Sequence, residues 1–111
     1  MKLNIILFTT EGCVNSRIMQ ARLLRAVQFK SNLHVQFATL DGLCDVKIYS
    51  LNNPKGKEIA RLYGATDAPT ILCPDNYNKR DNIVGVKTEH YIRNWIREQL
   101  IKNSKFDDEE S

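Results

Sequence analysis

The apolar segment at residues 3–8 places the strongest constraint on how this chain folds. It contains neither glycine nor proline, and its polar and apolar positions do not alternate regularly. A run this short and this apolar is typical of a β-strand that is covered on both faces. We therefore predict an α/β protein in which this strand is buried between helices.

A cysteine stands where this strand gives way to a helix. The polar turn at residues 9–12 ends in Gly12, and Cys13 comes just before a helical pattern. A side chain there faces the positive end of the helix macrodipole and its unpaired N–H groups, which lower the pKa of a thiol. Because the thiolate is the reactive form and Gly12 keeps the turn tight, we predict a reactive, accessible sulfur at Cys13.

The helix after Cys13 has an apolar stripe that suits packing on a sheet. Its apolar positions are Ile18, Met19, Ala21, Leu23, Leu24, Ala26 and Val27. Two charges near the cysteine act in opposite directions, because Arg17 would lower the pKa of the thiol and Glu11 would raise it. The sequence leaves the net direction of the pKa shift open.

Two strand-like runs compete for the next place in the sheet. Residues 34–40 and residues 46–51 both alternate in part, and Asp41 with Gly42 indicates a turn between them. We prefer 46–51 as the strand parallel to the first, since it leads directly into the next helix. Residues 34–40 would then be an insertion or an additional edge strand.

The second half of the chain predicts a helix, two antiparallel strands and a final helix. Asn53 and Pro54 are typical of a helix start, and Thr88 can cap the last helix. Residues 70–73 and 82–86 are the expected strands. The expected apolar faces of the two helices are Ile59, Ala60, Leu62 and Tyr63, and Tyr91, Ile92, Trp95, Ile96 and Leu100.

Length and composition indicate one small globular domain. The chain has 111 residues, for which we expect a domain at 1–104 and an acidic, disordered tail at 105–111. The apolar run at the start is too short for a signal sequence or a membrane span, so we expect a cytoplasmic protein with no membrane partner. The formal charge of +3 comes from Lys and Arg scattered without aromatic neighbours, so we do not expect a nucleic-acid partner.

Three cysteines lie far apart in the sequence, at Cys13, Cys44 and Cys73. They form no Cys-x-x-Cys pair, and both histidines are separate from them, so we expect no metal site. A reducing compartment with free thiols fits this pattern.

Two motifs together resemble the thioredoxin/glutaredoxin superfamily. Residues 10–16 look like the redox-active turn of that superfamily, and residues 53–70 are similar to the thioredoxin segment that runs from the second helix to the cis-proline, here Pro69. The resemblance covers about residues 3–101. It implies a thioredoxin fold with three α/β/α layers around a four- to five-stranded mixed sheet.

The resemblance also implies roles for single residues. Cys13 would be the nucleophile of thiol–disulfide exchange, and Ser16, which replaces the second cysteine of the superfamily, would donate a hydrogen bond to the thiolate. Pro69 would be cis and lie beside the sulfur, while the backbone of Ala68 would pair with an extended substrate. The substrate-binding residues are expected to be Gly12, Val14, Asn15, Ala68, Pro69 and Thr70.

A serine at position 16 implies a monothiol mechanism. Ser16 cannot attack a mixed disulfide, so release would need an external thiol such as glutathione or another cysteine. The expected partners are protein thiols or disulfides, with glutathione as a co-substrate and no bound cofactor. Cys44 is the internal candidate for the missing thiol, because Cys73 fits a buried core residue better.

Two other functions are compatible with the same motifs. Monothiol glutaredoxins bind an iron–sulfur cluster with glutathione in a dimer, but Val14 and Asn15 replace their glycine–phenylalanine pair, so the match is poor. The other is a non-catalytic module that uses the Cys13 and Pro69 surface to hold a protein partner. The missing second cysteine favours this module, and the retained Cys13 favours redox chemistry.

Overall fold

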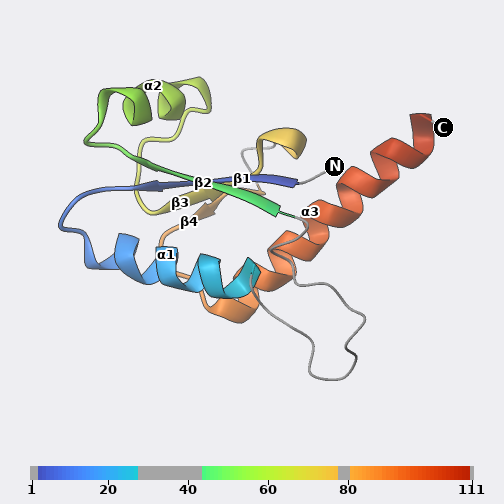
Figure 1. Cartoon of the computed structure of the whole chain (residues 1–111), viewed down its shortest axis with the longest axis horizontal. Coiled ribbons are helices and arrows are strands. Elements are labelled where there is room, and N and C mark those ends of the chain that lie inside the picture. The colour runs from blue at the N-terminus through green and yellow to red at the C-terminus, as the bar shows by residue number, and fades with distance from the viewer. Residues whose placement is uncertain (1–2, 28–43, 78–80, 111) are drawn as a thin grey trace.

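A four-stranded mixed sheet forms the centre of the computed structural model, which describes residues 3–27, 44–77 and 81–110 (Figure 1). The strand order is β2-β1-β3-β4. Helices α1 and α3 cover one face and α2 covers the other, so the predicted three-layer α/β/α architecture is confirmed. The elements are β1 (Leu3–Thr9), α1 (Val14–Val27), β2 (Cys44–Ser50), α2 (Pro54–Leu62), β3 (Thr70–Leu72), the 3-10 turn η2 (Pro74–Asn76), β4 (Ile83–Val84) and α3 (Glu89–Glu110).

β1 lies inside the sheet and is buried on both faces, as the sequence predicts. Leu3, Ile5 and Leu7 belong to the core beneath α1 and α3. Ile6 and Phe8 belong to the smaller core beneath α2. Because side chains of a strand alternate between its two faces, one continuous apolar run supplies both cores.

The position of β2 shows which of the two strand-like runs forms the strand parallel to β1. It pairs with β1 in parallel along its whole length, starting with Cys44 opposite Leu3. The prediction of a parallel strand at 46–51 is confirmed, although β2 begins two residues earlier. The competing run at 34–40 lies outside the described residues.

The first turn of α2 has the predicted cap. Asn53 Oδ1 accepts a hydrogen bond from the N–H of Lys55 at 2.9 Å, and Pro54 is the first helical residue. Gly64 follows the helix with a φ of +65°, a left-handed conformation that favours glycine at helix ends.

Gly56 lets α2 lie directly on the end of β2. A Cβ atom at this position would be 1.9 Å from the carbonyl oxygen of Ser50, far inside van der Waals contact. One turn later, Ala60 is buried in the core beneath the helix. Leu62 is 74% exposed, so its assignment to the apolar face of α2 was wrong. The sheet therefore buries only the narrow stripe of α2 that faces it.

The last strands and the cap of α3 agree with the sequence. β3 pairs antiparallel with β1 and with β4, as expected for residues 70–73 and 82–86. Thr88 Oγ1 accepts a hydrogen bond from the N–H of Tyr91 at 3.1 Å and so caps α3. The assignment of Tyr91 to the apolar face was wrong, because Tyr91 is 49% exposed.

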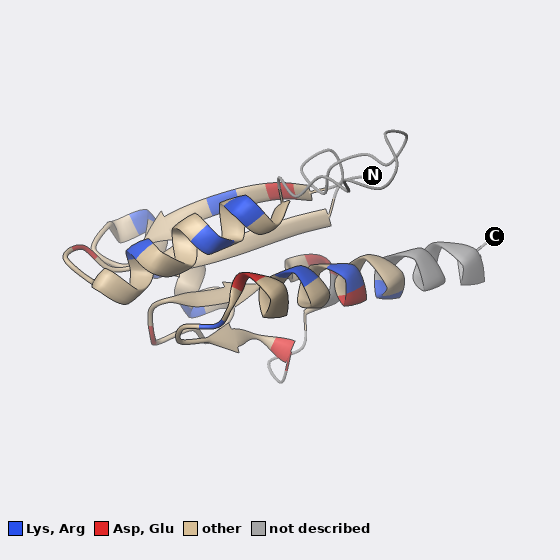
Figure 2. Ribbon diagram, turned by 90° about the horizontal axis from the view of Figure 1, so that it is seen from below, with Lys and Arg blue, Asp and Glu red and all other residues tan. Residues whose placement is uncertain are grey.

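Helix α3 contacts α1 through charged residues at its start. Glu89 forms ion pairs with Arg25 of α1 and with Arg93, each at 2.9 Å. Figure 2 shows Lys and Arg along both helices, with acidic residues between them on α3. The helix extends into residues 105–111, which we predicted as a tail, and the division between a domain at 1–104 and a tail stays a prediction. None of the described helices is both long and apolar enough to cross a lipid bilayer.

Candidate active site

Cys13 stands at the start of α1, at the end of the sheet where β1 stops. The helix begins at the next residue, and its first hydrogen bond runs from the N–H of Arg17 to the carbonyl oxygen of Cys13 at 3.3 Å. Cys13 therefore occupies the N-cap position. The turn before it is closed by a bond from the N–H of Cys13 to the carbonyl oxygen of Thr10 at 3.4 Å, with Gly12 at a φ of +71°. The thiol is partly exposed, so another sulfur can reach it.

Four hydrogen bonds hold the pKa of the Cys13 thiol below its ordinary value. The largest contribution is from the hydroxyl of Ser16, followed by the N–H of Ser16, the hydroxyl of Thr10 and the N–H of Asn15, while partial burial acts in the opposite direction. The two N–H donors are in the second and third helical residues, which an N-cap side chain normally satisfies with an oxygen. Here a sulfur takes that place, and a thiolate accepts these bonds better than a thiol does.

Ser16 is oriented to donate to the sulfur. Its side chain is 2% exposed, and its Oγ accepts a hydrogen bond from the N–H of Thr10 at 3.2 Å. Because that bond uses a lone pair, the hydroxyl proton is available to Cys13, and water cannot compete for it. These hydrogen bonds lower the pKa of the Cys13 thiol, and neither Arg17 nor Glu11 contributes to the shift.

Asn52 joins the turn before the cysteine to the end of β2. Its Oδ1 accepts a hydrogen bond from the N–H of Glu11 at 2.8 Å, and its own N–H donates to Ser50 Oγ at 3.1 Å. Next to it, the N–H of Leu51 donates to the carbonyl oxygen of Thr9 at 2.7 Å. Two hydrogen bonds thus tie the chain after β2 to the chain after β1 and hold the turn in place.

The proline motif lies at the same end of the sheet as the cysteine turn. Phe8 of β1 pairs with Thr70 of β3, so the antiparallel register sets Pro69 level with Thr9, the last residue of β1. The Ala68–Pro69 peptide bond is cis. The two predicted motifs, far apart in the sequence, therefore meet at one end of the sheet.

The residues that we predicted to bind substrate differ in exposure. The hydroxyl of Thr70 donates to the carbonyl oxygen of Asp67 at 2.7 Å, so this side chain stabilises the bend before β3. The backbone of Ala68 makes no hydrogen bond to any part of the chain that the structure describes. Gly12, Val14 and Asn15 are exposed, Ala68 is half-buried, and Pro69 and Thr70 are buried.

The other two cysteines lie in the core. Cys44 is 4% exposed and lies opposite Leu3, at the far end of a seven-residue strand, about 20 Å from the turn. It cannot reach Cys13, so its candidacy as an internal resolving thiol was wrong. Cys73 follows β3 and is buried in the same core, as predicted. The described residues contain no group of His, Cys, Asp or Glu that could hold a metal ion.

Two residues of the site escaped the sequence analysis. Thr10 could have been found, because a hydroxyl three residues before a cysteine at a helix start lies within reach of its sulfur. Asn52 offers no local signal, since its bond to Glu11 joins residues 41 positions apart.

Comparison with known proteins identifies the fold. No protein-family model matches the sequence, and no curated protein matches it. The solution structure of a thioredoxin from Thermus thermophilus is similar, with a TM-score of 0.59 and 17% sequence identity over 91% of this chain and 75% of that chain. At this level of identity the likeness concerns the backbone, because one fold serves many activities. The chain therefore has the thioredoxin fold.

Proposed function

We propose that this protein exchanges thiols and disulfides through a single nucleophile, Cys13, and forms mixed disulfides with proteins or with glutathione. The observation that carries the proposal is the set of hydrogen bonds around the sulfur, which lowers the pKa of a partly exposed thiol. A lower pKa increases the fraction of thiolate at neutral pH, and the thiolate is the form that attacks a disulfide.

The proposed reaction consists of two balanced exchanges. The Cys13 thiolate attacks one sulfur of a substrate disulfide, the S–S bond breaks, and the other substrate sulfur leaves as a thiolate. The thiolate of glutathione then attacks the substrate sulfur of the mixed disulfide, and Cys13 leaves as a thiolate. Each step consumes one disulfide and forms one. The donors around Cys13 favour its departure, because a thiol of lower pKa leaves faster.

A second candidate function is a non-catalytic module that holds a protein partner. Ser16 replaces the second thiol, and Cys44 and Cys73 are both buried, so no cysteine of this chain can release a mixed disulfide formed at Cys13. Exposed Val14 and the backbone of Ala68, which has no hydrogen-bond partner among the described residues, would then provide contacts without turnover.

The pH dependence of alkylation at Cys13 tests the proposal. The rate follows the thiolate fraction, so its midpoint should lie below the pKa of an ordinary thiol, about 8.5. Ser16→Ala removes the largest contribution, so the midpoint should rise and the rate at neutral pH should fall. The same shift makes stability depend on pH. Because the pKa of Cys13 is lower in the folded state than in the unfolded state, the thiol stabilises the fold fully at pH values above its unfolded-state pKa. This stabilisation is lost as the pH falls through the folded-state pKa. A wild-type midpoint equal to that of an ordinary thiol would contradict the proposal.

Turnover separates the two candidate functions. Reduction of a peptide–glutathione mixed disulfide should proceed with glutathione as the reductant, be slow with thioredoxin reductase, and vanish in Cys13→Ser. Ser16→Cys should add dithiol activity, since the new thiol would lie beside the nucleophile. Equal rates for wild type and Cys13→Ser would exclude the enzymatic function and leave the binding module.

A further inference from the structure

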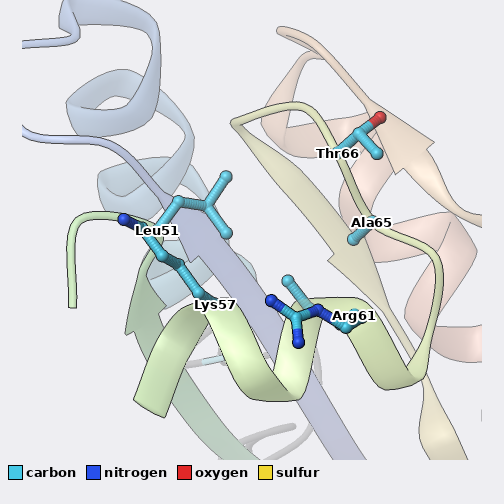
Figure 3. A pocket seen from close by; sticks show the side chains of 6 residues that line it. Leu51, Lys57, Arg61, Ala65 and Thr66 are labelled. Atoms are coloured by element: carbon cyan, nitrogen blue, oxygen red, sulfur yellow. The ribbon is translucent and has the colours of Figure 1, made fainter. Parts of the chain in front are cut away.

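A cavity of about 280 Å³ lies beside α2, at the end of the sheet that carries the cysteine turn. Figure 3 shows its side chains coming from α2, from the turn after β2 and from the segment before β3. The lining residues are Leu51, Lys57, Ala60, Arg61, Ala65 and Thr66. Its floor is apolar, and two cationic side chains border it.

The lining residues connect this cavity to the site around Cys13. Leu51 donates its N–H to the carbonyl oxygen of Thr9, from which the cysteine turn departs. Thr66 is two residues before Ala68, so their Cα atoms are at most about 7 Å apart. The cavity therefore borders both segments that form the candidate active site.

Two cationic side chains of α2, Lys57 and Arg61, border the cavity without an acidic partner among the described residues. Lys57 and Arg61 are one helical turn apart, and Figure 3 shows both at the same cavity. Like charges at this spacing disfavour a helix. Neither residue forms an ion pair within the part of the chain that the structure describes, although Glu58 is on the same helix. A bound anion would relieve their repulsion.

We propose that Lys57 and Arg61 bind carboxylate side chains of the protein segment whose disulfide reacts with Cys13. The preferred substrates are then disulfides with acidic residues close to the reactive cysteine. This inference rests on the proposed function and adds the class of substrate. It makes the two cations substrate-binding residues that take no part in the exchange itself.

The shape of the cavity favours a protein segment. The apolar floor, with Leu51 and Ala60, suits the methylene groups of a glutamate, while Arg61 can bind its carboxylate through two parallel hydrogen bonds. Close by, the backbone of Ala68 has no partner among the described residues and can pair with an extended chain. A substrate paired at Ala68 would carry its neighbouring side chains past the cavity. Glutathione also has carboxylates, so the test includes it.

The test compares two peptides that differ only in charge. Each forms a disulfide with a chromogenic thiol, and two glutamates next to the cysteine in one peptide are glutamines in the other. The rate constant for release of the chromogenic thiol should be about fivefold higher for the glutamate peptide, as expected for exposed ion pairs. High salt should reduce this preference, because it screens charges at the surface.

Variants then locate the preference in the cavity. The double variant Lys57→Gln/Arg61→Gln should react at equal rates with the glutamate peptide and the glutamine peptide, because it lacks the two cations that distinguish them. Lys55→Gln is the matched control, since it removes one charge from the same helix outside the cavity and should keep the preference. In Cys13→Ser, fluorescence anisotropy should show tighter binding of the glutamate peptide without any exchange.

Each outcome supports or overturns the proposal. If wild type reacts equally fast with both peptides, the substrate preference is absent and the exchange function stands. If neither peptide reacts and the Cys13→Ser protein binds both equally, the exchange function and the preference both fail. If the double variant slows only the reaction with oxidised glutathione, the cavity binds this small disulfide and the inference for protein substrates is overturned.

Discussion

The two ends of β1 place a cysteine in opposite surroundings. At the end of the strand, Cys13 opens a helix, is partly exposed and receives hydrogen bonds from two hydroxyls and two N–H groups. At its beginning, Cys44 lies opposite Leu3 and is packed among aliphatic side chains. Both residues are cysteines, so the difference in their exposure and hydrogen bonding comes from the groups that surround each position.

A helix start and a strand start supply different groups. The first N–H groups of a helix have no partner within it, and they favour a negative charge nearby. The N–H groups of paired strands are taken up by the neighbouring strand, so a side chain between them meets other side chains from the core. The same sheet can therefore hold one thiol ready for chemistry and another sealed from it.

Native thiol labelling should reveal the largest difference between the two ends. An alkylating reagent should modify Cys13 quickly and reach Cys44 and Cys73 only when the chain opens. Those two should react at least about 1,000-fold more slowly, because typical unfolding free energies are about 5 kcal/mol or more. Intact-protein mass spectrometry should find one label in buffer and three in denaturant. Rapid labelling at two sites in buffer would contradict the burial of the core cysteines.

Gly56→Ala tests how firmly α2 is fixed at the Cys13 end of the sheet. The added Cβ would meet the backbone of Ser50, which cannot move aside as a side chain can, so the free energy of unfolding should fall by about 3 kcal/mol. Gly12→Ala is the control, since open space surrounds it and only its positive φ is unfavourable, which costs about 1 kcal/mol. Urea denaturation measures both, and equal losses would argue against the close contact.

Cys44→Ala sharpens the comparison by separating stability from reactivity. Removing a buried sulfur from the core should lower the free energy of unfolding by about 1.5 kcal/mol, and the alkylation rate of Cys13 should not change. Cys13→Ser should show the reverse, with exchange lost and the core intact. A change in the alkylation rate of Cys13 on replacing Cys44 would show that the two ends are coupled.

Asn52→Ala should have the smallest effect. It leaves the N–H of Glu11 without its partner, which should lower the free energy of unfolding by about 1 kcal/mol and change the alkylation rate of Cys13. Asn53→Ala is the matched control, because losing a helix cap costs a similar 1 kcal/mol or so but leaves the cysteine turn untouched. If both variants alter the rate equally, Asn52 has no positioning role.

Features that depend on neighbouring residues could be predicted from the sequence. The apolar run of β1, the glycine before Cys13 and the cap at Asn53 each specify local structure, and the structure agrees with all three. The pairing of the two motifs came from a resemblance, and the register of β1 with β3 places them together.

Features that depend on how elements face each other could not be predicted. Periodicity shows that a helix has an apolar side, yet it does not show how wide a stripe its neighbours cover, and both Leu62 and Tyr91 fall outside that stripe. The expected strand at 46–51 left Cys44 outside the sheet, whereas in the structure Cys44 pairs with Leu3 of β1 and is the first residue of β2. The bond from Glu11 to Asn52 requires the parallel register, which no local pattern contains.

Because Cys44 and Cys73 are buried, each native molecule can form one intermolecular disulfide, through Cys13. Oxidation in solution can then join two copies through Cys13, and growth stops there, since a linked pair has no further sulfur to offer. Crosslinked ladders should form only from opened chains, and the size of the oxidised species reports whether the fold was intact when the bond was made.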